Sequence, residues 1–238
     1  MKKKIISLCL TVALAAVGVT GATLAYFTDT DSATNVFTVG NIDISLTENF
    51  EQNSLLMPVT GSAQNGTLKN GVKKEVYVNT EEGSQPAYVR VQIAIPDVLD
   101  DGASTFDAGK NVLHFNYSGN ADYNWNWKTN ADGTGNWNYY EKTIDGIDYN
   151  VYVVTYNDIL EAGDTTAYPA MNQVYLDKNV TSSDAAKINE ELGSNWKILV
   201  AAQGTQVAGF EDPYTALNTA FGTPTADNSP FADTAASE

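Results

Sequence analysis

The sequence predicts an all-β domain with two short helices, and two patterns in the chain carry that prediction. Apolar and polar residues alternate with the period of a half-buried strand, most clearly over residues 41–46 and 86–96. Asp-Gly pairs at 132–133 and 145–146 separate runs of β-branched and aromatic residues, as the turns of antiparallel hairpins do. Because no linker and no repeat of fixed period interrupts these runs, we predict one domain over residues 26–222.

The N-terminus has the features of an export leader. Three lysines at residues 2–4 precede an apolar run over residues 5–20, which is short and rich in small residues. Small residues at Thr23 and Ala25 place the signal cleavage between Ala25 and Tyr26. The alternative is a membrane anchor that is never cleaved. The leader therefore predicts a secreted protein.

The composition excludes two classes of function. The chain has 13 Lys+Arg and 29 Asp+Glu; removing residues 1–25 takes three lysines and no acid, so the mature net charge is 10 − 29 = −19. Nucleic-acid binding depends on phosphate neutralisation by basic side chains, so we expect no nucleic-acid partner. Cys9 is the only cysteine and lies in the leader, which excludes disulfides and thiol chemistry from the mature chain.

The first mature segment is predicted to be a strand that a polar arm separates from the leader. Residues 28–35 are polar, and the apolar positions that follow alternate with polar ones after Asn41. Gly40 and Asn41 predict a bulge or bend inside this segment. Its apolar side chains, starting from the leader junction, are Phe27, Val36, Val39, Ile42, Ile44 and Leu46.

The rest of the domain is predicted from the same patterns. Further strands are expected over residues 72–79, 112–117, 149–156, 173–176 and 196–207. Helices are expected over 184–192 and 213–221, the second between an N-cap at Asp212 and a stop at Gly222. Residues 223–238 are small, polar and acidic, which predicts a disordered tail.

An aromatic hairpin is predicted around the turn at residues 132–133. Trp125 and Trp127 alternate with asparagines before the turn, and Trp137 and Tyr139 do so after it. Two interpretations of the three tryptophans stay open. Their rings either stack on the sugar rings of a polysaccharide or cover the core beneath the hairpin.

Catalytic motifs are absent from the sequence. His114 is the only histidine, and neither an HExxH nor a GxSxG motif occurs, so we predict no catalytic residue and no metal or other cofactor site. Calcium stays open as a cofactor because acidic side chains occur in close pairs, although none has EF-hand spacing. These groups are Asp29/Asp31, Asp97/Asp100/Asp101, Asp145/Asp148 and Glu211/Asp212.

Several segments resemble the TasA and camelysin family of Gram-positive bacteria. They are the Tyr-Phe-Thr-Asp start after the leader, FTVGNIDISL, PAYVRV, VYLDKNV and the closing AAQGTQVAGFEDPYTALNTAFG. The resemblance implies a jelly-roll-like antiparallel β-sandwich, a leader processed by a signal peptidase of the SipW type, and assembly into fibres of the biofilm matrix. It also implies that the freed N-terminal strand of one subunit completes the sheet of the next.

We therefore expect a non-enzymatic matrix protein that polymerises with itself, with residues 26–46 as the donor strand. Donor and acceptor surfaces differ, so such a contact propagates into a filament. Other matrix proteins and polysaccharide are further expected partners. Two alternatives are a cell-surface metalloprotease of the camelysin kind, which the resemblance also implies, and a carbohydrate-binding surface module.

Overall fold

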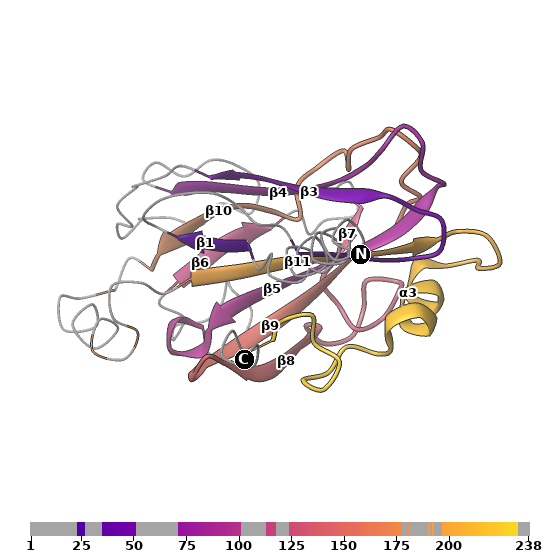
Figure 1. The fold of residues 1–238 in the computed structure, drawn as a ribbon. Helices are drawn as coiled ribbons and strands as arrows, with labels where there is room; N and C mark the ends of the chain where they lie inside the picture. Colours follow the sequence, from indigo (N-terminus) through magenta and orange to yellow (C-terminus); the bar gives the residue numbers. More distant parts are fainter. Residues whose placement is uncertain are drawn as a thin grey trace, which may run out of the picture.

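The computed structural model describes residues 23–26, 35–50, 71–100, 113–117, 124–177, 180, 190, 192 and 197–232. These residues form two β-sheets that face each other, with a short helix against the outer side of the larger sheet (Figure 1). The predicted all-β sandwich is confirmed. The jelly-roll topology that the family resemblance implies stays a prediction.

The larger sheet has seven strands, and each of its two outer edges is shared by two short strands. β11 (Lys197–Gln206), β5 (Ala87–Pro96) and β9 (Ile147–Tyr156) form its centre. The strands beside β11 are β1 (Thr23–Tyr26) and β2 (Asn35–Val39), and those beside β9 are β7 (Trp125–Asn126) and β8 (Tyr139–Ile144). All pairs are antiparallel except β2 with β11, which is parallel and corrects the antiparallel prediction at that one pair.

The smaller sheet has four antiparallel strands in the order β3-β4-β10-β6. Their bounds are Ile44–Phe50 for β3, Val72–Thr80 for β4, Met171–Leu176 for β10 and Leu113–Tyr117 for β6. The predicted strands are thus present, with ends shifted by no more than a few residues, and β5 ends at Pro96, which has no backbone N–H to donate. A short 3-10 helix, η1 (Asp97–Leu99), follows β5.

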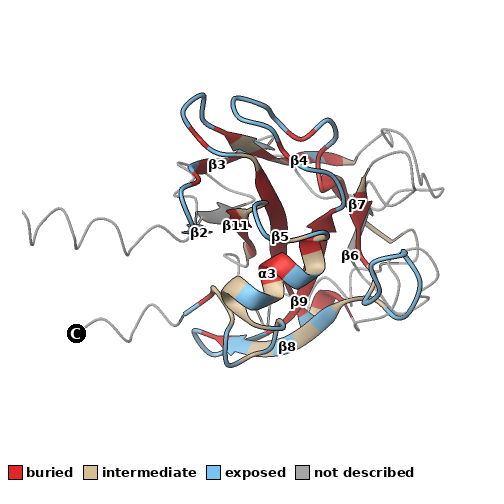
Figure 2. Cartoon of the chain, turned by 90° about the vertical axis from the view of Figure 1, so that its right-hand side faces the viewer, coloured by how far each residue is buried: buried red, intermediate tan, exposed pale blue. Residues whose placement is uncertain are grey.

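The hydrophobic core lies between the two sheets, and the central strands are buried on both faces. Every residue of β5 is buried, and so are all but the two ends of β11. The outer face of the larger sheet is covered by the α-helix α3 (Pro213–Phe221) and by the segment that follows it (Figure 2). A sheet buried on both faces needs such a cover, because its outward side chains are also removed from water.

Helix α3 has the predicted bounds and caps. The Asp212 carboxylate accepts a hydrogen bond from the backbone N–H of Thr215 at 2.9 Å, Pro213 occupies the first turn, and Gly222 ends the helix at a φ of 80°. Of the other predicted helix, over residues 184–192, only Glu190 and Leu192 belong to the described residues, and both are helical.

The segment after α3 is packed against the sheet, which corrects the predicted disordered tail for residues 223–232. Phe231 is 3% exposed and joins a cluster with Ala94 and Leu199 on the outer face of the sheet. The Ser229 hydroxyl donates a hydrogen bond to the Tyr140 hydroxyl, with the two oxygens 2.9 Å apart. Small polar composition predicted disorder here, but one aromatic anchor and local hydrogen bonds hold the segment in place. Residues 233–238 lie outside the described part.

Candidate assembly interface

The outer edge of β11 is covered by the two N-terminal strands, one after the other. β1 pairs antiparallel with its first half, from Tyr26 opposite Lys197 to Thr23 opposite Val200. β2 pairs parallel with its second half, residues 201–205. Both strands belong to the segment around the leader junction, so the segment predicted to donate a strand lies on a sheet edge of its own chain.

The predicted assembly strand is divided between the two sheets. Val36 and Val39 lie on β2 in the larger sheet, whereas Ile42, Ile44 and Leu46 are buried between the sheets, the last two on β3. The predicted bend at Gly40 and Asn41 is where the chain crosses over: Gly40 has a φ of +97°. In this structure the second half of the strand is core, so only the part before Gly40 lies on the outer edge of the larger sheet.

The junction between β2 and β3 packs tightly on β11. A Cβ on Gly204 would lie 2.8 Å from Ile44 Cδ1 and 3.1 Å from Ile42 Cδ1, and one on Gly40 would lie 2.8 Å from Gln206 Oε1. Glycine at position 204 therefore lets the two isoleucines approach the sheet closely. This contact could not be predicted from the sequence, because a single glycine inside an apolar strand does not indicate which element packs against it.

β2 itself is only thinly packed. Val36 is partly buried against the main core, but Phe37 is 38% exposed and Val39 is 44% exposed. Backbone pairing with β11 therefore holds this strand more than side-chain burial does. Exposed apolar side chains on an outermost strand are typical of a site that pairs with another chain.

The residues of the predicted signal cleavage lie inside β1. Ala25 is opposite Ile198 and Tyr26 is opposite Lys197, so the bond between them sits within the strand pairing. Cleavage there would leave Tyr26 as the only residue of β1 on the mature chain. Phe27, also named for the assembly strand, lies outside the described residues.

The aromatic segment is built differently from the predicted hairpin. Asn138 N–H donates to the Trp127 carbonyl and Thr129 N–H to the Asn136 carbonyl, both at 2.9 Å, which forms the part nearest the turn. Trp125, however, pairs with Tyr156 of β9. Trp125 and Trp127 are each 2% exposed and belong to the main core, whereas Trp137 is half-buried. Buried rings cannot stack on a sugar, so the structure favours the hairpin covering the core.

The catalytic and metal candidates do not come together among the described residues. His114 lies on β6 opposite Tyr175, in the strand that the sequence predicted. No group of three or more His, Cys, Asp or Glu side chains able to hold a metal occurs in the described part of the chain. Of the acidic groups, Asp100 is buried against Tyr152, while Asp29, Asp31 and Asp101 lie outside the described residues.

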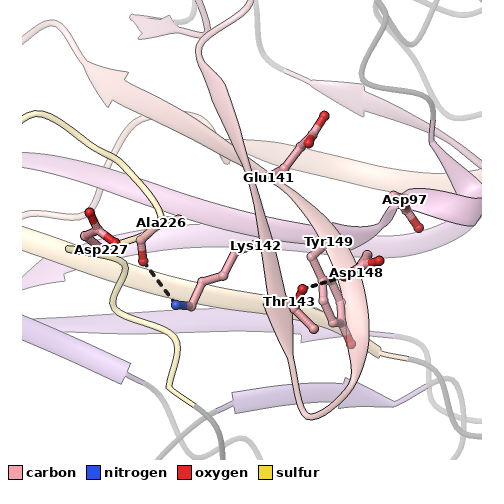
Figure 3. Close-up of a pocket in the computed structure, with 8 residues that line it drawn as sticks. All are labelled: Asp97, Glu141, Lys142, Thr143, Asp148, Tyr149, Ala226 and Asp227. Carbon is pink, nitrogen blue, oxygen red and sulfur yellow. Dashed lines mark hydrogen bonds between the residues drawn. The ribbon is translucent and has the colours of Figure 1, made fainter.

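An open pocket of about 480 Å³ lies beside the β8–β9 hairpin (Figure 3). Four carboxylates line it, from Asp97, Glu141, Asp148 and Asp227. They are spread apart along the pocket, and the Lys142 ammonium between them donates to the Ala226 carbonyl at 3.0 Å. Burial, with a further contribution from Asp145, raises the pKa of the lining Tyr149 to about 12. This dispersed arrangement lends no support to a calcium site.

The N-terminal region is the part of the chain that a family model matches. Residues 1–57 match the model described as camelysin metallo-endopeptidase. The resemblance to the TasA and camelysin family is confirmed. The matched residues contain the predicted leader, the predicted cleavage bond and the strands β1, β2 and β3. The matched range thus includes the segment that lies along the β11 edge.

The other comparisons add no relative. Neither the search of curated proteins nor the search of solved structures returned a match. Among the described residues, no helix has the length and apolar character needed to cross a membrane.

Proposed function

We propose that this protein is a secreted structural subunit of an extracellular matrix, and that it polymerises by passing its N-terminal strand to the next subunit. The observation that carries this proposal is the edge of β11, which residues 23–26 and 35–39 of the same chain cover end to end. A second mature copy presents residues 26–39 and the same edge of β11. Exchange between copies therefore makes in trans the pairing that the single chain makes in cis.

The packing of β2 supports this exchange. Releasing β2 uncovers the partly buried side chain of Val36, whereas Phe37 and Val39 are already 38% and 44% exposed. After Gly40 the chain is held in place by Ile42 and Ile44, which are buried in the core. Residues 26–39 are thus the part of the chain that can leave, and Gly40 is the point about which they turn. Each exchange leaves an edge for the next copy, which gives an open filament.

Leader removal supplies a switch in this scheme. The last leader residues cover β11 opposite Ile198, Leu199 and Val200. Cleavage after Ala25 removes them, so the first half of the β11 edge loses its partner while the donor segment gains a free end. An edge with unpaired N–H and C=O groups favours β-augmentation by another chain. A SipW-type peptidase and a biofilm setting are the corresponding expectations from the family.

An engineered disulfide bond between β2 and β11 tests the proposal, because the same variant can be compared in its oxidised and reduced forms. Val36 lies opposite Ala202 in the parallel pair, and the mature chain has no cysteine of its own. In the double variant Val36→Cys/Ala202→Cys, starting at Tyr26, an oxidised bond would hold the strand on its own chain. We expect filaments by negative-stain electron microscopy only in the reduced form.

Two further samples complete this experiment. The unsubstituted chain starting at Tyr26 should form filaments with and without reductant, and a version lacking residues 26–35 should form none. Confirmation of the intramolecular bond by intact mass must precede the comparison. Filaments of equal number and length in the oxidised and reduced double variant would show that assembly uses another edge.

The family description favours a second candidate, a metal-dependent endopeptidase. His114 is the only histidine of the chain, and the described acidic side chains form no cluster suited to a metal. The discriminating result is proteolysis that survives rigorous purification, disappears with a chelator and returns with added zinc. His114→Ala should abolish that activity if the histidine ligates the metal.

A further inference from the structure

The outer face of the larger sheet holds a cluster of buried polar side chains under α3. Arg90 and Gln92 project from β5 and Gln203 projects from β11, and all three are buried. The Gln203 side-chain oxygen accepts from Arg90 Nε at 2.6 Å and from Gln92 Nε2 at 3.0 Å. The Tyr140 hydroxyl donates to the Gln92 side-chain oxygen at 2.6 Å, which ties β8 to the same cluster.

Arg90 is a buried cation whose described hydrogen-bond acceptors are all neutral. Besides Gln203, its guanidinium donates to Asn218 Oδ1 at 3.0 Å and to the Gly222 carbonyl at 3.2 Å. The ion pairs among the described residues are Lys73–Glu75 and Lys74–Glu48, and neither involves Arg90. The side chain is 2% exposed, and burial lowers its pKa to about 10, so it stays charged at neutral pH.

The helix compensates for only part of this charge. Asn218 and Gly222 lie at the C-terminal end of α3, where the helix dipole is equivalent to roughly half a negative charge. The other buried cation among the described residues, Lys74, contacts a full carboxylate at Glu48. A chain with 29 acidic residues thus places none of its described carboxylates beside Arg90. Leaving a buried charge without a counter-charge is costly, so the site is suited to an anion from outside.

A cavity of about 130 Å³ lies next to the guanidinium. The residues that line it include the hydroxyl-bearing Thr129, Thr155, Tyr214 and Thr223 and the amides Asn138 and Asn218, and none of them carries a carboxylate. Because ~10–15 Å³ of such volume is enough for one water, the cavity has room for a small organic anion. Val153 and Leu217 add an apolar wall.

We propose that this cavity binds a small carboxylate anion of the size of acetate. A guanidinium has five N–H groups, and the described acceptors take three of those on Arg90, which leaves one on each terminal nitrogen. A planar carboxylate accepts from such a pair in a forked arrangement. The Asn138 side-chain amide lines the cavity and is a further donor, and the short alkyl part contacts Val153 and Leu217.

Saturation-transfer NMR on the methyl protons of acetate tests this site, with the purified protein in a chloride-free buffer of constant ionic strength. We expect a saturable signal from the unsubstituted protein and its complete loss in Arg90→Met. Lys142→Met is the matched control, because Lys142 is a cation on the same face that lies outside this cavity. It should bind acetate as the unsubstituted protein does.

A second variant keeps the proposal testable if Arg90→Met does not fold. Asn138→Ala removes an amide from the wall while leaving its backbone hydrogen bonds, and we expect acetate binding several-fold weaker. A signal that does not saturate, or one that Arg90→Met leaves unchanged, would show that the cavity holds only water. Displacement of acetate by chloride at equal concentration would overturn the assignment to a carboxylate. This inference does not depend on filament formation.

Discussion

The two outer edges of the larger sheet are covered in the same way but packed differently. β11 carries β1 and β2 along one edge, and β9 carries β7 and β8 along the other. On β7 and in the loop that follows it, Trp125 and Trp127 are buried in the main core, whereas β2 exposes Phe37 and Val39. Backbone pairing is similar at both edges, so the difference between them lies in side-chain burial. We call the β9 edge sealed because its covering segment is buried in the core, and we expect the covering strand β2 to detach more easily from the β11 edge.

Sequence separation adds to this difference. β8 joins β9 through a two-residue turn at Asp145 and Gly146, both with positive φ, so that edge closes locally. β1 and β2 reach β11 from the opposite end of the chain. A strand supplied from far away in sequence is as easily supplied by a second copy, while a hairpin strand is always nearest to its own chain.

Hydrogen exchange should show the largest contrast between the edges. We expect the amides of residues 35–39 to open at a free energy roughly 3 kcal/mol or more below those of residues 149–154, about a hundredfold in protection. The reason is that β2 opens locally, whereas β9 opens only when the domain unfolds. Mass spectrometry of the chain starting at Tyr26, kept dilute so that it is monomeric, is the measurement. Equal protection of the two segments would break the comparison.

A tryptophan on the sealed edge should be essential for stability. Trp127 packs against Trp137 and Tyr152, each with ring centroids 6.0 Å away. Trp127→Ala should lower the free energy of unfolding by about 3–5 kcal/mol, because a large buried ring is removed. The matched control on the other edge is Val39→Ala, for which we expect a change within about 0.5 kcal/mol. Urea unfolding of both variants is the check, and a similar loss in the two would contradict the proposed difference.

The strands and the capped helix could be predicted from the sequence because their signals are local. Alternation fixes the strand faces, and the Asp212 cap and Gly222 stop give α3 its observed bounds. The pairing partners are not local. The sequence of residues 35–39 does not indicate that they pair parallel with β11. Likewise, the sequence around Trp125 does not indicate that this residue pairs with β9 and not with the strand on the other side of the turn that follows it. Tertiary packing determines which strands pair and in which direction.

The candidate interface was half predictable for the same reason. The leader junction and the bend at Gly40 could be predicted from the sequence. The division of the assembly strand into an edge part and a core part could not, because it depends on which sheet each half joins. The tail shows the converse error. Composition predicted disorder over residues 223–232, and a single aromatic, Phe231, packed on the sheet was enough to overturn it.

Gly204 offers a test of where the exchangeable segment ends. Gly204→Ala would place a methyl group 2.8 Å from Ile44 Cδ1, so we expect overpacking that destabilises the domain by about 1–3 kcal/mol. Gly83→Ala is the control, because its added methyl group meets nothing within 4 Å. Thermal unfolding of the two variants separates the cases. No difference between them would mean that the isoleucines after Gly40 are not fixed on β11, and that the exchangeable segment extends further.

The smallest effect is expected from the cap of α3, which covers the sheet between the two edges. Asp212→Ala should cost about 1 kcal/mol at neutral pH, because the Thr215 N–H loses its acceptor. Hydrogen bonds from Thr215 lower the pKa of Asp212 in the folded state. A depressed folded pKa means that this contribution is present above the unfolded value, about 3.9, and is lost as the pH falls through the folded pKa.

The Asp212→Ala variant also tests whether the two edges open by different routes. The stability difference between Asp212→Ala and the unsubstituted protein, measured by urea unfolding, should shrink as the pH falls below about 4. At neutral pH the variant should lower the protection of residues 149–154, which exchange by global unfolding, and leave that of residues 35–39 unchanged, because local opening of β2 does not involve α3. A matching loss at residues 35–39 would show that β2 opens only together with the whole domain, and the two edges would then be equivalent.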